Sequence, residues 1–196
     1  MLNTHFIKLT TRIILIVLVV LFQVTSQGCF ITNTPGFYSG YKKLTKEQQG
    51  HIKVYAKDAS SHAKEDFISI NGVQLREMLK SYGTSVVYMW SPNCHSRVCV
   101  PLNALKKHYE SMNYQLFVVA EYYDFEKTKI LKPDDIDMFS VNHKYYGTDY
   151  VPLYLKRFKK DLIGSREVGY ERQLFFYRGQ LIHSPSTMWP PLKTGL

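Results

Sequence analysis

Apolar and polar positions repeat with two different periods between residues 66 and 184. Continuous apolar runs and strict alternation predict strands, whereas apolar residues three and four apart predict helices. The segments that this pattern predicts as strands are 66–72, which ends in an Asn-Gly turn, 85–90, 115–122 and 136–141. The segments that it predicts as helices are 73–81, 102–112 and 150–162, and residues 173–183 fit a β-hairpin around an Arg-Gly turn. Residues 44–56 fit a short helix or turn, and residues 125–135 show no clear pattern.

Strands and helices therefore alternate along the chain. This order predicts an α/β fold, a three-layer sandwich with a mainly parallel sheet covered on both faces and an antiparallel hairpin at its edge. The helix at 150–162 is expected to start at a Thr148 or Asp149 cap, to hold Pro152 in its first turn and to end at Gly164.

The amino-terminal segment has the pattern of an export signal. Lys8 and Arg12 precede an apolar run of ten residues, 13–22, and small polar residues then lead to Cys29. Ten apolar residues are too few to span a hydrocarbon core, which needs about 20. The pattern predicts a bacterial signal peptide over 1–28, and Gly28-Cys29 resembles a lipoprotein signal in which Cys29 is lipidated. An uncleaved membrane anchor is the alternative, and both place the following residues outside the cytoplasm on a membrane.

Composition and charge narrow the class of protein. Hydrophobic residues make up 45% and charged residues 21% of the 196 residues, which is typical of a globular chain. Residues 29–45 are rich in Gly, Thr, Ser and Asn and are expected to be a tether, followed by a domain at 46–190 and a tail at 191–196. The formal charge is +9, but the basic residues are spread along the chain, so no nucleic-acid partner is expected. We find no Ser-His-Asp pattern, zinc motif or phosphate-binding glycine loop in the sequence.

The segment Trp90-Ser91-Pro92-Asn93-Cys94 follows the apolar strand at 85–90 and precedes the helix at 102–112. This order resembles the thioredoxin superfamily, in which a buried strand ends in Trp-x-x-x-Cys before a helix. Trp90 and Cys94 match that spacing, Pro92 stands where many members have a proline, and Pro101 resembles the proline that kinks the helix. The hairpin at 173–183 resembles the last two strands of the family. The resemblance covers about residues 66–184 and implies a thioredoxin-like fold.

Cys94 is the best candidate nucleophile. The resemblance places it at the amino end of a helix, whose partial positive charge can lower a cysteine pKa from about 8.5 into the range 3.5–7.5. Arg97 would add positive charge there. The implied function is thiol-disulfide exchange by a membrane-anchored lipoprotein of the bacterial envelope, facing the periplasm or the exterior. Its partners would be thiols or disulfides of envelope proteins, and the chemistry needs neither a cofactor nor a metal.

In this interpretation Cys94 attacks a disulfide and Cys99 resolves the mixed disulfide. Trp90 shields the site, Arg97 favours the thiolate, and Ser91 and Pro92 are further supporting residues. Cys94 and Cys99 are five residues apart, however, whereas thioredoxins use Cys-x-x-Cys. In a regular helix this spacing puts the Cα atoms about 8–9 Å apart, beyond the ~4.4–6.8 Å of a disulfide. A bond between them therefore requires that the first helical turn is unwound.

A second departure concerns the residues before the hairpin, where thioredoxin-fold enzymes place a cis-proline. Residues 168–172 contain no proline, which puts the docking of a standard disulfide substrate in doubt.

Three other functions remain open. A non-catalytic thioredoxin-like lipoprotein could bind a partner and keep the two cysteines as a structural pair. Ser91-Pro92-Asn93-Cys94 is also similar to the Thr-Pro-Gly-Cys motif of Q-type peroxiredoxins, which use a Cys-x4-Cys pair, although Val87 replaces their upstream proline. Copper delivery would need Cys94, Cys99 and a distant histidine such as His143.

Overall fold

The computed structural model describes residues 36–56, 67–94, 99–133, 135–136, 138–164, 169 and 171–184. The predicted signal peptide, Cys29, Arg97 and the tail at 191–196 lie outside the described residues. Within the described ranges, no helix is long and apolar enough to cross a membrane.

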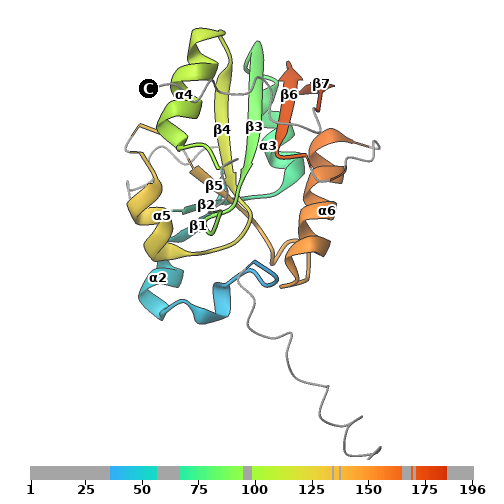
Figure 1. Ribbon diagram of the computed structural model, residues 1–196. Coiled ribbons are helices and arrows are strands. Elements are labelled where there is room, and N and C mark those ends of the chain that lie inside the picture. The colour runs from blue at the N-terminus through green and yellow to red at the C-terminus, as the bar shows by residue number, and fades with distance from the viewer. Residues whose placement is uncertain are drawn as a thin grey trace, which may run out of the picture. The chain divides into compact units, whose positions relative to one another are not determined.

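A seven-stranded mixed sheet forms the centre of the domain, in the order β1-β2-β5-β4-β3-β6-β7 (Figure 1). The strands are β1 (Ile52–Val54), β2 (Phe67–Ile70), β3 (Thr84–Trp90), β4 (Gln115–Ala120), β5 (Met138–Val141), β6 (Gln173–Tyr177) and β7 (Gln180–His183). The five strands from β1 to β3 in this order are parallel, and β6 and β7 are antiparallel to their neighbours. The predicted parallel sheet with a carboxyl-terminal hairpin is confirmed.

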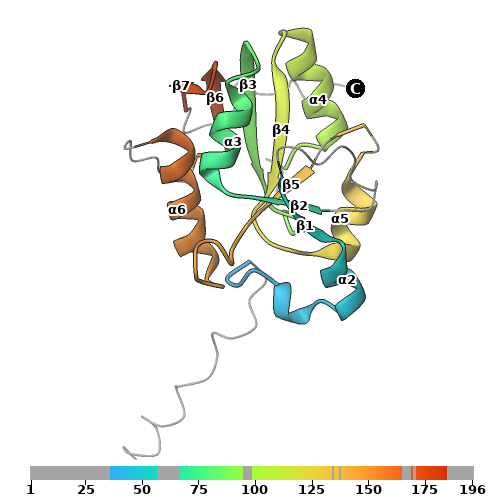
Figure 2. The same cartoon turned by 180° about the vertical axis from the view of Figure 1, so that it is seen from behind.

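Helices cover both faces of the sheet. The described residues form the 3-10 helix η1 (Tyr41–Lys43) and the α-helices α2 (Lys46–Gly50), α3 (Gly72–Leu79), α4 (Leu102–Ser111), α5 (Phe125–Leu131) and α6 (Val151–Ile163). α3 and α6 lie on one face, and α4 and α5 lie on the other, as the two opposite views show (Figures 1 and 2). The predicted three-layer α/β arrangement is therefore confirmed.

β3 is an interior strand of the sheet that contributes side chains to both hydrophobic cores. Val87 and Met89 join the core that also contains Leu75 of α3 and Phe158 of α6. Their neighbours Val86, Tyr88 and Trp90 point to the opposite face and join the core with Leu102 and Leu105 of α4. A strand buried on both faces has no polar face, which explains the continuous apolar run at 85–90.

Two predicted helix starts need correction. Asn71 and Gly72 do not form a turn, because the Asn71 side chain accepts a hydrogen bond from Gln74 N at 2.9 Å and caps α3. The expected Thr148 or Asp149 cap of α6 is also wrong: Tyr150 occupies the N-cap position without a side-chain cap bond. Pro152 in the first turn and Gly164 at the end of α6 are confirmed.

The described part of the expected tether packs against the domain. Ser39 N donates to Asp149 O at 2.9 Å, and Val151 N donates to Phe37 O at 2.9 Å. Gly40 adopts a φ of 79°, and a Cβ there would collide with the backbone of Tyr123, so this position needs glycine. The compact unit begins at Gly36, upstream of the expected domain start at 46.

Candidate functional site

Cys94 and Cys99 form a disulfide beyond the carboxyl end of β3, with their Cα atoms 5.8 Å apart. α4 begins at Leu102, downstream of both cysteines. We expected that a disulfide between these cysteines requires a non-helical backbone, and α4 indeed begins after both of them. The expectation that Cys94 stands at the amino end of the following helix is wrong for α4, so the dipole of α4 does not account for a reactive Cys94.

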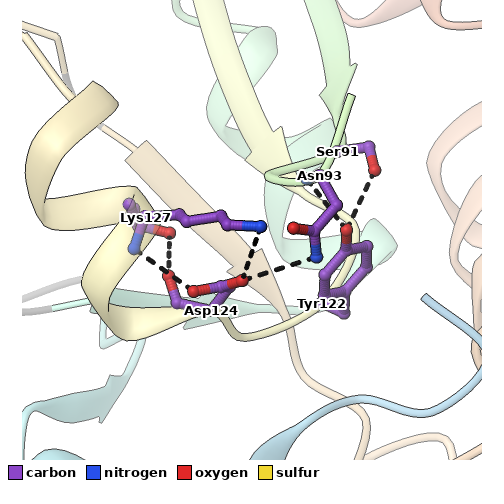
Figure 3. Close-up of polar contacts among 6 residues, drawn as sticks. Ser91, Asn93, Tyr122, Asp124 and Lys127 are labelled. Carbon is purple, nitrogen blue, oxygen red and sulfur yellow. Dashed lines mark hydrogen bonds and ion pairs between the residues drawn. The ribbon is translucent and has the colours of Figure 1, made fainter. Parts of the chain in front are cut away.

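The loop before Cys94 is held by a polar network from the segment between β4 and α5 (Figure 3). The Tyr122 hydroxyl accepts a hydrogen bond from Asn93 N at 3.0 Å and lies 3.2 Å from Ser91 Oγ. Asn93 Nδ2 donates to Asp124 Oδ2 at 3.4 Å. Asp124 also caps α5 by accepting from Lys127 N at 3.2 Å. The loop that presents Cys94 is thereby tied to the start of α5.

Arg172 supplies positive charge directly to the cysteine pair. Its Nη1 donates to Cys94 Sγ at 3.4 Å. Its backbone oxygen accepts from Met89 N at 2.8 Å, which fixes Arg172 beside the end of β3. A guanidinium stays charged at every physiological pH, so it stabilises a thiolate at that sulfur. Arg172 is therefore placed to supply the charge that we expected of Arg97, which lies outside the described residues, and Arg172 is the last of the residues 168–172 that lack a proline.

Three ionisable groups that are partly or fully removed from solvent interact with Arg172. Burial raises the pKa of Glu121, and the charges of Arg172 and Lys159 oppose this effect. Burial lowers the pKa of Lys159, against the attraction of Glu121 and Glu171. Burial also raises the pKa of Tyr88, and the charge of Arg172 and a hydrogen bond with it act in the opposite direction. The site is thus a low-dielectric cluster in which charges affect one another strongly.

The other predicted site residues occupy structural positions around the disulfide. Trp90 is buried in the core with α4, Pro92 is buried, and Ser91 contacts Tyr122. Among the described residues, no group of three or more His, Cys, Asp or Glu side chains could hold a metal ion. His143 instead contacts the rings of Tyr41 and Tyr123.

Sequence reasoning missed Arg172, Glu121, Lys159 and the hydroxyl of Tyr122. A weak signal existed for the first two residues, because Glu121 ends the apolar run of β4 and Arg172 directly precedes the apolar run of β6. Nothing in the local pattern indicated Lys159, which lies in a basic stretch of α6 typical of a solvated helix face.

These observations define an α/β protein with a mostly parallel mixed sheet and a disulfide beyond the carboxyl end of a central strand. Comparisons of the chain with protein-family models, with curated proteins and with solved structures each found no match. The function is therefore argued from the geometry of the site.

Proposed function

We propose that this domain is thioredoxin-like and carries out thiol-disulfide exchange through Cys94 and Cys99. The observation that carries the proposal is the Cys94–Cys99 disulfide at the end of β3 with Arg172 Nη1 3.4 Å from Cys94 Sγ. The order of strands and helices around it supports the thioredoxin-like assignment. Parallel strands commonly place reactive groups at their carboxyl ends, and β3 places Cys94 there.

The exchange proceeds in two balanced steps. The thiolate of reduced Cys94 attacks a partner disulfide, which forms a mixed disulfide and releases one partner thiolate. The thiolate of Cys99 then attacks Cys94 Sγ, which forms the Cys94–Cys99 bond and releases the second partner thiolate. The partner gains two electrons and this protein loses two, and a protein dithiol must return them before the next cycle. The sulfurs alone carry the electrons, so no cofactor takes part.

Arg172 decides which cysteine attacks and influences the reduction potential. Its guanidinium contacts Cys94, so the thiolate of Cys94 is the stabilised one. Stabilising this thiolate favours the reduced form, which makes the disulfide more oxidising. We infer that the protein acts in the bacterial envelope, where the predicted export signal at 1–28 and lipidation of Cys29 would hold it on a membrane.

A trapping experiment with the full-length exported protein tests the proposal. In a Cys99→Ser variant the mixed disulfide cannot be resolved, so we expect Cys94 to accumulate in covalent complexes with envelope proteins, seen by non-reducing electrophoresis. Cys94→Ser is the matched control and should form none. A redox titration read by thiol alkylation should give a potential between about −120 and −270 mV.

Two outcomes would contradict the proposal. A bond that resists reduction below about −300 mV would indicate a structural disulfide and a non-catalytic binding module. Covalent complexes that Cys94→Ser forms as readily as Cys99→Ser would show that Cys94 is not the attacking cysteine. Hydrogen peroxide is tested in the same assay: oxidation of Cys94 by peroxide without trapped proteins would favour the peroxiredoxin-like alternative.

A further inference from the structure

Lys159 is a buried lysine whose hydrogen bonds converge on the segment before Arg172. Its residue is 8% exposed, whereas Lys156 and Lys160 on the same helix are exposed. Lys159 Nζ donates to Gly169 O at 2.9 Å and to Glu171 O at 2.8 Å. Lysine is rarely buried to this extent unless its ammonium is paired, because removing the charge from water is costly.

The segment that Lys159 holds is attached on its other side to β3. Arg172 O accepts from Met89 N at 2.8 Å, next to the Glu171 carbonyl that Lys159 binds. The backbone on both sides of the Arg172 nitrogen is therefore fixed, by α6 through Lys159 and by β3 through Met89. Long flexible side chains such as arginine lose conformational freedom when they make one defined contact. When the backbone of Arg172 is already fixed, less conformational entropy is lost as its side chain forms the contact with Cys94 Sγ.

The groups that face this cluster come from several elements. Glu121 at the end of β4 and Glu171 attract Lys159, Arg172 repels it, and Tyr88 of β3 interacts with Arg172. An apolar side chain at position 159 would leave the Gly169 and Glu171 carbonyls without this donor, which costs the folded state stability. The ammonium therefore fixes the backbone directly before Arg172.

We propose that Lys159 is a positioning residue that acts through the Gly169 and Glu171 carbonyls to hold the Arg172 guanidinium on Cys94. This inference rests on the proposed function, since it concerns the activation of Cys94. Without Lys159 the segment loses two hydrogen bonds, the Arg172–Cys94 contact is made less often, and the thiolate loses its stabilising charge.

The test measures the pH dependence of Cys94 alkylation in the full-length protein, with Cys99→Ser as the background and peptide mass spectrometry as the readout. Lys159→Met should raise the pKa of Cys94 by about one unit and lower the alkylation rate about tenfold at pH values below that pKa. Lys159→Arg, which keeps the charge and the donors, should restore most of the rate. Lys160→Met, on an exposed position of the same helix, should leave the profile unchanged.

A double-mutant cycle separates positioning from a direct effect of the lysine charge. If Lys159 acts through Arg172, then Lys159→Met causes no further shift in an Arg172→Met background. Equal shifts in both backgrounds would overturn the proposal, as would a Cys94 profile that Arg172→Met alone does not change. The measurement on Arg172→Met alone does not need the Lys159→Met variant, so the proposal can be overturned even if Lys159→Met fails to fold.

Alkylation reports the thiol itself and needs no partner protein. A Cys94 profile that depends on Lys159 in a protein that traps no partner would overturn the exchange function and retain the positioning role. If partners are trapped but the pH profile of Cys94 alkylation does not depend on Lys159, the exchange function is retained and the positioning role is overturned.

Discussion

The hydroxyl of Tyr122 shows how one side-chain atom shapes the candidate site. It accepts from the Asn93 amide at 3.0 Å, one residue before Cys94, and Asn93 continues the network to Asp124. The pair Tyr122-Tyr123 reads in the sequence as two aromatic residues at a core edge, and both are buried. The role of the hydroxyl depends on which loop lies against it, and residue type does not specify that.

His143 makes a pH-dependent contribution to stability. Its ring contacts Tyr41 and Tyr123 at centroid distances of 5.0 and 5.6 Å, and its Nδ1 has no hydrogen-bond partner among the described residues. Burial lowers the pKa of His143; Lys144 and Lys42 lower it further, and Asp149 opposes them.

The sign of the effect follows from the protons that each state binds. The unfolded chain protonates this histidine near pH 6.5, whereas the folded protein does so only at a lower pH. Between these two pKa values the unfolded state binds more protons, so stability decreases as the pH falls from about 6.5. We expect His143→Phe to flatten the dependence of the unfolding free energy on pH between 7 and 5, measured with urea.

His183→Phe, at an exposed position, is the control for this measurement and should retain the native slope. An unchanged slope in His143→Phe would show that the burial of His143 contributes nothing to the pH dependence.

At the scale of elements, the contact between α3 and α6 depends on a glycine. A Cβ on Gly72 would lie 2.7 Å from Leu162 N and closer still to Phe158 O. The backbone of α6 therefore lies directly against the first residue of α3. This close approach brings Leu75 and Leu79 of α3 into the core that contains Leu162.

Gly72→Ala and Gly50→Ala should change stability in opposite directions. Alanine is a better helix former than glycine by about 1 kcal/mol, but at position 72 its methyl group overpacks the helix contact at a cost of about 1–3 kcal/mol. At Gly50, the last residue of α2, a Cβ meets nothing within 4 Å, so alanine should stabilise the protein by up to about 1 kcal/mol. Denaturant unfolding measures both values, and a stabilising Gly72→Ala would contradict the close approach of α3 and α6.

Elements that were predictable from the sequence are the long and buried ones. β3, α3, α4 and α6 bury a continuous run or a regular face, so their periods are visible in the sequence. The pattern did not predict β1 or α5. β1 is a three-residue edge strand that is largely exposed, and in α5 the apolar Ile130 is 78% exposed, which obscures a helical period.

At the scale of the whole molecule, the disulfide lies outside the two hydrophobic cores. Neither core contains Cys94 or Cys99, and each core is formed by a face of the sheet and its helices. The cysteines close a loop of only a few residues. By lowering the entropy of the unfolded chain, the disulfide therefore adds only about 2 kcal/mol to the free energy of unfolding. We therefore expect the fold not to depend on the bond, as exchange chemistry requires.

We expect the reduced protein to remain folded and to lose at most about 2 kcal/mol of unfolding free energy. Denaturant titrations of the oxidised and reduced forms, followed by circular dichroism, measure the difference. Unfolding on reduction would identify the bond as structural and would remove the basis for the exchange function.

The sequence by itself determined the α/β order, the closing hairpin and the need for non-helical geometry at Cys94 and Cys99, because these depend on local periodicity and on distances along one segment. Only the tertiary structure decided that Arg172 contacts Cys94, that Lys159 binds the carbonyls before Arg172, and that residues from Gly36 onward pack against the domain. Each of these contacts joins segments distant along the chain. They depend on which strands are neighbours and which helix covers which face, and the hydrophobic pattern of one segment carries no information about either.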